Sequence, residues 1–126
     1  MAITLEALKT MLCDMVCDNW AIINTASAEY AKVERSVRPF SNLRYNVSTP
    51  LEKFIEANVT VEVCNRVRTV IEVYESVLAD DEKIYAELKD HIFKFFEQEK
   101  PENPIEILSD RTYRKVYAII LRAISE

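Results

Sequence analysis

The sequence predicts an all-α protein: one domain over residues 1–126, built as a helical bundle of five to six helices. Three observations support this prediction. Apolar side chains recur every three or four residues over long stretches, which is the spacing of one helix face. Two tetrapeptides carry strong helix-start signals, and the chain contains no glycine. Because the tight turns of β-hairpins rely on glycine, its absence disfavours hairpin-rich β folds. A helix can end without glycine if asparagine or another polar residue adopts the left-handed conformation.

The first predicted helical segment covers residues 4–37 and forms one long helix, or two helices separated near Asp18 and Asn19. Its apolar face continues over many turns and consists of Leu5, Leu8, Leu12, Met15, Asn19, Ile22, Ala26, Tyr30, Val33 and Val37. A loop over residues 38–49 follows, because Pro39 disfavours helical geometry at Arg38 and polar residues crowd the stretch. We expect this loop to pack on the core.

Helix starts are predicted most clearly at Thr49-Pro50-Leu51-Glu52 and Asn103-Pro104-Ile105-Glu106. Each offers an N-cap side chain, a proline at the first helical position, and a glutamate that completes a capping box. After Thr49 we expect a short helix, a break near Asn58, and a second helix. The apolar face of the second helix consists of Val59, Val63, Val67, Val70, Ile71, Tyr74, Val77 and Leu78.

Two further helices complete the predicted bundle. The first of them is capped by Asp80 and Asp81, and the sequence from Lys100 to Pro104 ends it sharply. Its apolar residues are Ile84, Tyr85, Leu88, Ile92, Phe95 and Phe96. Ser109 is the predicted cap of the last helix, whose apolar face carries Tyr113, Val116, Tyr117, Ile120, Leu121 and Ile124.

The composition fits an ordinary globular domain, with 49% hydrophobic and 29% charged residues. No stretch approaches the roughly 20 apolar residues of a membrane span, so we expect no membrane contact. The N-terminal sequence lacks the basic segment of a secretory signal, which predicts an intracellular, cytoplasmic protein. The chain contains three cysteines, Cys13, Cys17 and Cys64. Because this number is odd, they cannot form a closed disulfide framework within one chain. We predict that they are reduced and buried.

The absence of glycine also excludes several classes of functional site. A dinucleotide-binding loop, a P-loop, a nucleophile elbow and an EF-hand all need glycine at defined positions. His91 is the only histidine, and its place at the edge of an apolar stripe indicates a boundary position. The cysteines lack the paired knuckles of structural zinc sites. We therefore predict no catalytic residue, no cofactor and no metal, which means that the protein is not an enzyme.

Two groups of basic and aromatic residues form the predicted partner-binding surface. Tyrosine and arginine are enriched at interface hot spots. The predicted partner-binding residues are Arg38, Arg44 and Tyr45 in the loop, with Arg111, Tyr113, Arg114 and Lys115 in the last helix. In the alternative interpretation, Asp110 and Glu106 neutralise the basic residues of the last helix through pairs four residues apart.

The predicted function is a non-enzymatic protein-interaction module, namely an adaptor, inhibitor or regulatory protein that acts through a helical surface. The expected partner is a protein, or a second copy of the chain in a homo-oligomer. The alternative is a nucleic-acid-associated structural protein, a coat-type helical bundle whose arginine groups bind phosphates after oligomerisation. The net charge of −5 disfavours a nucleic-acid partner.

Overall fold

The computed structural model describes residues 2–34 and 48–125, and these residues form four helices. The helices are α1 (Leu5–Glu34), α3 (Ser48–Ser76), α4 (Asp81–Phe96) and α5 (Pro104–Ser125). No strand occurs in these two ranges, so the predicted all-α class is confirmed. The predicted number of five to six helices is wrong, because the expected interruptions inside three of the helices are absent.

The first two of these continuous helices are α1 and α3. α1 passes through Asp18 and Asn19 without a break, and α3 passes through Asn58. The side-chain amide of Asn19 donates to the carbonyl of Met15 at 2.7 Å, so the polar residue is satisfied within its own helix. α3 also begins at Ser48, two residues before the predicted first helical position. The long loop and its expected packing on the core lie outside the described residues.

α5 is the third continuous helix. It begins directly after Asn103, as its start signal predicts, and the backbone carbonyl of Asn103 accepts from Ile107 at 2.8 Å. Ser109 lies inside α5 and caps no helix, contrary to the prediction. The prediction of a cap at Asp80 is confirmed, because its carboxylate accepts a hydrogen bond from the backbone of Lys83 at 2.8 Å.

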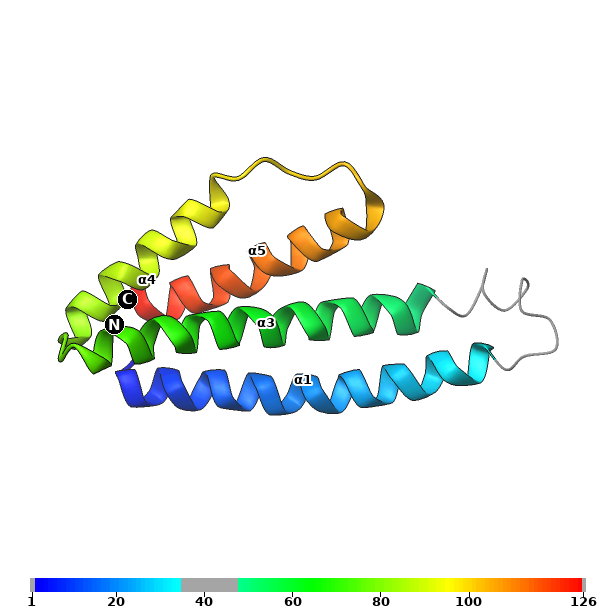
Figure 1. The fold of residues 1–126 in the computed structure, drawn as a ribbon, viewed down its shortest axis with the longest axis horizontal. Helices are drawn as coiled ribbons and strands as arrows, with labels where there is room; N and C mark the ends of the chain where they lie inside the picture. The colour runs from blue at the N-terminus through cyan, green and yellow to red at the C-terminus, as the bar shows by residue number, and fades with distance from the viewer. Residues whose placement is uncertain (1, 35–47, 126) are drawn as a thin grey trace.

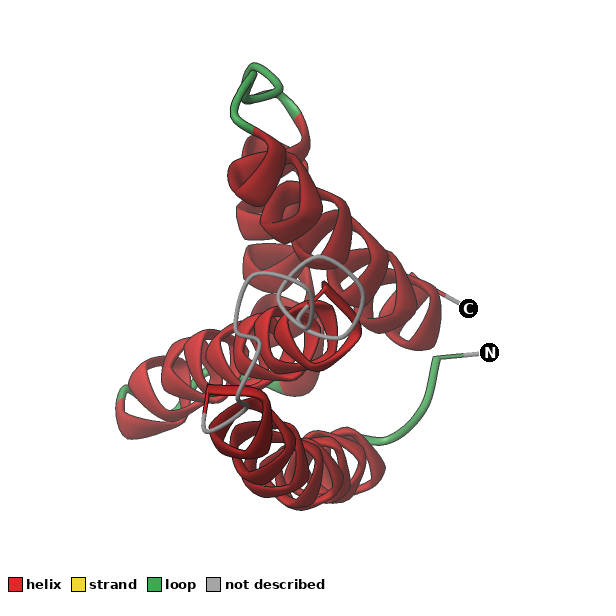
Figure 2. Cartoon of the chain, turned by 90° about the vertical axis from the view of Figure 1, so that its right-hand side faces the viewer, coloured by secondary structure: helices red, strands yellow, loops and turns green. Residues whose placement is uncertain are grey.

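α3 is the central helix, and it contacts each of the other three helices. α1 runs antiparallel along α3, whereas α4 and α5 pack on other sides of it (Figure 1). The end-on view in Figure 2 places α1 and α5 on either side of α3, with the segment before α1 close to the C-terminal end of α5. The backbone N–H of Ile3 donates to the carbonyl of Ala123 at 3.0 Å, and the hydroxyl of Tyr85 donates to the carbonyl of Ile3 at 2.5 Å. These bonds hold the N-terminus to α4 and α5.

The main core consists of one apolar stripe from each helix, and most of these positions agree with the predicted faces. Its buried residues are Leu5, Leu8, Leu12, Val59, Val63, Cys64, Val67, Ile71, Ile84, Leu88, Ile92, Val116, Tyr117, Ile120 and Ile124. The prediction fails farther along α1, where Ile23 packs on Ala57 and Val61 while Ile22 is exposed. Neighbouring positions at the edge of a stripe differ by only about 100° around a helix, so the position of α3 decides which one is buried.

α3 ends in a Schellman motif, in which Leu78 has a φ of 60°. The N–H of Leu78 donates to the carbonyl of Glu75, and that of Ala79 donates to the carbonyl of Tyr74, both at 3.0 Å. Leu78 is 93% exposed, and Val77 is also exposed, so their predicted place on the apolar face is wrong. The left-handed position is filled by an apolar residue, contrary to the expectation of a polar one.

The three cysteines are free, but they differ in burial. Cys64 is buried between the helices, whereas Cys13 and Cys17 are exposed, contrary to the prediction. The buried stripe of α1 passes through Leu8 and Leu12, and Cys13 lies one residue further around the helix. None of the helices in the described ranges carries an apolar window long enough to cross a membrane.

Candidate functional site

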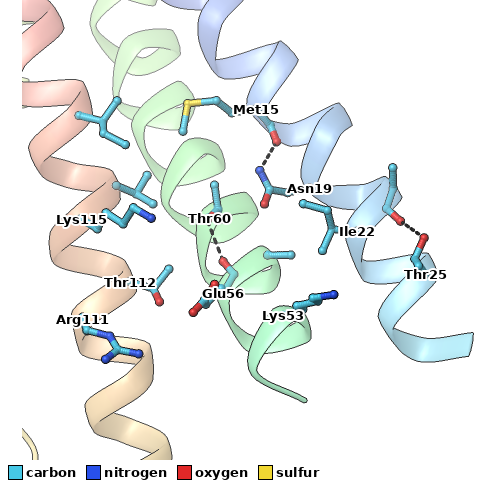
Figure 3. A pocket seen from close by; sticks show the side chains of 14 residues that line it. Met15, Asn19, Ile22, Thr25, Lys53, Glu56, Thr60, Arg111, Thr112 and Lys115 are labelled. Atoms are coloured by element: carbon cyan, nitrogen blue, oxygen red, sulfur yellow. Dashed lines mark hydrogen bonds between the residues drawn. The ribbon is translucent and has the colours of Figure 1, made fainter. Parts of the chain in front are cut away.

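A groove of about 850 Å³ lies between α1 and α5, with α3 as its floor (Figure 3). Its walls are joined at one end of the molecule by the bond between Ile3 and Ala123. Small side chains at Ala57 and Thr60 line the floor. Because these residues fill little volume, the space between the two walls stays open.

The apolar part of the groove includes two large side chains on opposite walls. Ile22 on α1 and Ile119 on α5 each line the groove and are each 42% exposed. Met15, Ala57 and Val116 line it as well and are half-buried or buried. A partner that covered the two isoleucines would remove apolar surface from water, which favours association by roughly 25 cal/mol per Å².

Each neutral polar side chain of the groove donates a hydrogen bond within its own helix. The hydroxyls of Thr25, Thr60 and Thr112 each donate to the backbone carbonyl four residues earlier, at 3.0, 2.7 and 3.0 Å. The amide of Asn19 also donates to the carbonyl four residues earlier. A partner could therefore cover the threonine hydroxyls without leaving a buried donor unpaired, which would cost about 1–3 kcal/mol.

The charged residues of the groove are predominantly basic. The groove is lined by three basic residues, Lys53 on α3 with Arg111 and Lys115 on α5, and by one acidic residue, Glu56 on α3. None of these four exposed side chains takes part in the ion pairs found among the described residues. The lining thus has an excess of two positive charges, although the whole chain has a net charge of −5.

A separate cluster of titratable side chains connects α3, α4 and α5. Arg66 pairs with Glu62 at 2.6 Å, and the hydroxyl of Tyr113 donates to Glu62. The Nε2 atom of His91 lies 3.3 Å from the hydroxyl oxygen of Tyr117, and the two rings meet edge to face. The predicted boundary position of His91 is confirmed, since the residue is half-buried between α4 and α5.

The environment of this cluster keeps its members in their neutral or paired forms. Burial and the hydrogen bond to Glu62 raise the pKa of Tyr113 to about 12. Burial also raises the pKa of Tyr117. Burial and the nearby Arg66 guanidinium lower the pKa of His91, which favours its neutral imidazole. We interpret the cluster as a set of polar contacts that holds the three helices together.

The structure separates the predicted partner-binding residues. Arg111 and Lys115 line the groove, but Tyr113 belongs to the cluster with Glu62. Arg114 pairs with Asp110 at 2.8 Å, as the alternative interpretation of the last helix predicts. Arg38, Arg44 and Tyr45 lie outside the described residues.

Sequence reasoning missed Lys53, Ile22 and Ile119 as groove residues. The signals for a special surface on α1 were Asn19, a polar residue at an apolar position, and the neighbouring Trp20. Ile22 lies one turn farther along the same side of the helix and lines the groove with Asn19. No pattern along the chain relates Ile22 to Ile119, because the two walls are joined only by the folded structure.

No group of three or more histidine, cysteine, aspartate or glutamate residues in the described ranges is arranged to hold a metal ion. Comparisons with protein-family models, curated proteins and solved structures found no match to this chain. The groove is thus the candidate site on geometry alone.

Proposed function

We propose that this protein is a non-enzymatic protein-interaction module that binds a partner protein in the groove between α1 and α5. The observation that carries this proposal is the pair of half-exposed isoleucines, Ile22 and Ile119, on opposite walls of one groove. Exposed large apolar side chains gathered at one place are typical of binding surfaces. An adaptor, an inhibitor or a regulatory protein would use such a surface in the same way.

The dimensions of the groove support a polypeptide partner. The floor extends from Lys53 to Thr60, which is about 10 Å at 1.5 Å per helical residue. This length matches about two turns of a bound helix, and insertion of an amphipathic helix into an apolar groove is a recurring mode of recognition. Because the threonine hydroxyls already donate hydrogen bonds within their own helices, apolar contact is the main source of affinity for the partner.

Site-specific photo-crosslinking tests the proposal. A benzophenone amino acid at position 22 or 119 should form an adduct with a discrete protein in the cells that produce this chain. The same amino acid at position 118 is the matched control, because Ala118 is exposed on α5 but does not line the groove. Adducts formed at position 118 alone, or at none of the three positions, would contradict the proposal.

The nucleic-acid alternative receives less support from the arginines. Arg66 is paired with Glu62, and Arg114 is held by Asp110, so neither guanidinium is free to bind phosphate without breaking a contact. Only Arg111 lines the groove among the described arginines. Retention of an RNA or DNA oligonucleotide at low salt, falling steeply as salt is added, would favour this alternative.

Self-association is the other version of the proposed function. A second copy of the chain would then occupy the groove, and light scattering would report a dimer or a larger species. Ile119→Asp should return that species to a monomer. If the chain stayed monomeric over the full concentration range, the partner that binds in the groove would be a different protein.

A further inference from the structure

We propose that the groove binds an amphipathic helix whose acidic residues lie along the edge that faces α5. This inference rests on the proposed function and adds the chemical nature of the partner. It is carried by the distribution of charge over the two walls and the floor of the groove.

The two walls differ in charge. The residues of α1 that line the groove are all uncharged, namely Met15, Asn19, Ala21, Ile22 and Thr25. The α5 wall carries Arg111 and Lys115. On the floor, Glu56 points toward α5 and Lys53 points toward α1 (Figure 3). A bound helix would therefore meet two basic side chains from α5 along one edge and no charged side chain from α1 along the other. Complementary charges at such an edge orient the partner and suppress the binding of wrong partners.

The basic residues of the groove form no ion pair within the described part of the chain, unlike five others. Lys9, Arg66, Lys83, Lys94 and Arg114 all form ion pairs with carboxylates of the same chain. None of the ion pairs of the described residues includes Lys53, Arg111 or Lys115, although all three line the groove. Their charges are thus available to an external carboxylate.

The spacing along α5 indicates where the partner's carboxylates lie. Arg111 and Lys115 are four residues apart, which is one turn or about 6 Å along the helix axis. A partner helix lying alongside α5 would match them with two acidic residues that are also four apart. Its apolar side chains, spaced three and four residues apart, would pack between Ile22 and Ile119.

A selection from a displayed peptide library tests this inference. The library contains helical peptides of about five turns with fixed leucines on one face and random glutamate or lysine at the positions that flank it. Selection on the wild-type protein should enrich glutamate pairs four residues apart on one flank. Selection on the variant Arg111→Glu, Lys115→Glu should enrich lysine there instead, and should weaken the wild-type peptides by about tenfold or more.

A matched variant separates local charge from total charge. Lys100→Glu, Arg122→Glu makes the same change in net charge at two exposed positions outside the groove, and it should select the same peptides as the wild type. The circular-dichroism melt of the groove variant should agree with the wild type, because Arg111 and Lys115 make no ion pair in the described residues. The control variant should melt slightly lower, because Arg122 lies in the last turn of α5, where a cation interacts favourably with the helix dipole.

The outcomes distinguish the inference from the proposed function. Peptides that show no preference for glutamate but lose binding in Ile119→Asp would overturn the acidic partner and leave the interaction module standing. Peptides whose binding depends on neither Ile22 nor Ile119 would overturn both. If a single-stranded DNA oligonucleotide bound through Arg111 and Lys115 and acidic peptides did not bind, the ligand of the groove would be a phosphate-bearing molecule and not a helix.

Discussion

The guanidinium of Arg114, in the middle of α5, donates a hydrogen bond to the carbonyl oxygen of Phe96, the last residue of α4, at 3.2 Å. The same group donates to the carbonyl of Gln98 at 3.0 Å and pairs with Asp110 at 2.8 Å. The last carbonyls of a helix have no partner within it, and a cation there also interacts favourably with the helix dipole. Arg114 therefore satisfies the end of α4 and holds α4 against α5.

Replacement of Arg114 should destabilise the fold. Arg114→Ala leaves Asp110 unpaired and the carbonyls of Phe96 and Gln98 without their donor, which should lower the free energy of unfolding by about 1–3 kcal/mol. Urea denaturation measures the change. Arg111→Ala removes the same kind of side chain from an exposed position and should stay within about 0.5 kcal/mol of the wild type. Equal losses in the two variants would show that Arg114 does not have this role.

Replacement of Leu78 by glycine should stabilise the protein. The left-handed conformation costs a residue with a side chain roughly 1–2 kcal/mol, and Leu78 buries almost nothing that glycine would lose. After the greater backbone entropy of glycine is subtracted, we expect a net gain of about 0.5–1 kcal/mol in Leu78→Gly, measured by thermal or urea unfolding. Ala86→Gly, at an exposed position inside α4, should instead lose about 1 kcal/mol. A loss of stability in both variants would contradict the assigned backbone conformation.

Acidification should destabilise the protein through His91. Its pKa is lowered from 6.5 by burial and by Arg66, so the folded chain binds fewer protons than the unfolded chain just below that pH. Stability is then fully present above about pH 6.5 and is lost as the pH falls through the lowered pKa. Urea denaturation at pH 7.5 and pH 5.5 should show a smaller loss in His91→Gln than in the wild type. The same loss in both proteins would assign the acid sensitivity to other groups.

The cysteines should react with a thiol reagent in two classes. Cys13 and Cys17 are exposed and should be modified in the native protein, although the proximity of Cys13 raises the pKa of Cys17. Burial raises the pKa of Cys64 to about 11, and its modification should require unfolding. Titration with Ellman's reagent should count two thiols before and three after addition of denaturant. In Cys64→Ala the count should be two under both conditions.

The candidate site was only partly predictable from the sequence. Arg111 and Lys115 were predicted because basic residues near tyrosines are typical of interface hot spots. Tyr113 and Arg114 belong to the same stretch, yet they point to different neighbours, Glu62 and Phe96. Adjacent residues of a helix face different directions, so a run of residues in sequence cannot be one surface. The groove instead combines positions from α1, α3 and α5.

The sequence by itself determined the all-α class, the stripes that pass through Leu8, Val63 and Ile120, the cap at Asp80, and the start of α5 after Asn103. These features depend on the spacing and chemistry of residues within a few turns of one another. Only the tertiary structure decided that the predicted breaks are absent, that Ile23 is buried in place of Ile22, and that Ile22 lies across a groove from Ile119. The spacing of residues within a few turns is enough to form a helix and its apolar stripe. Contact with another helix then decides which of two residues at the edge of that stripe is buried.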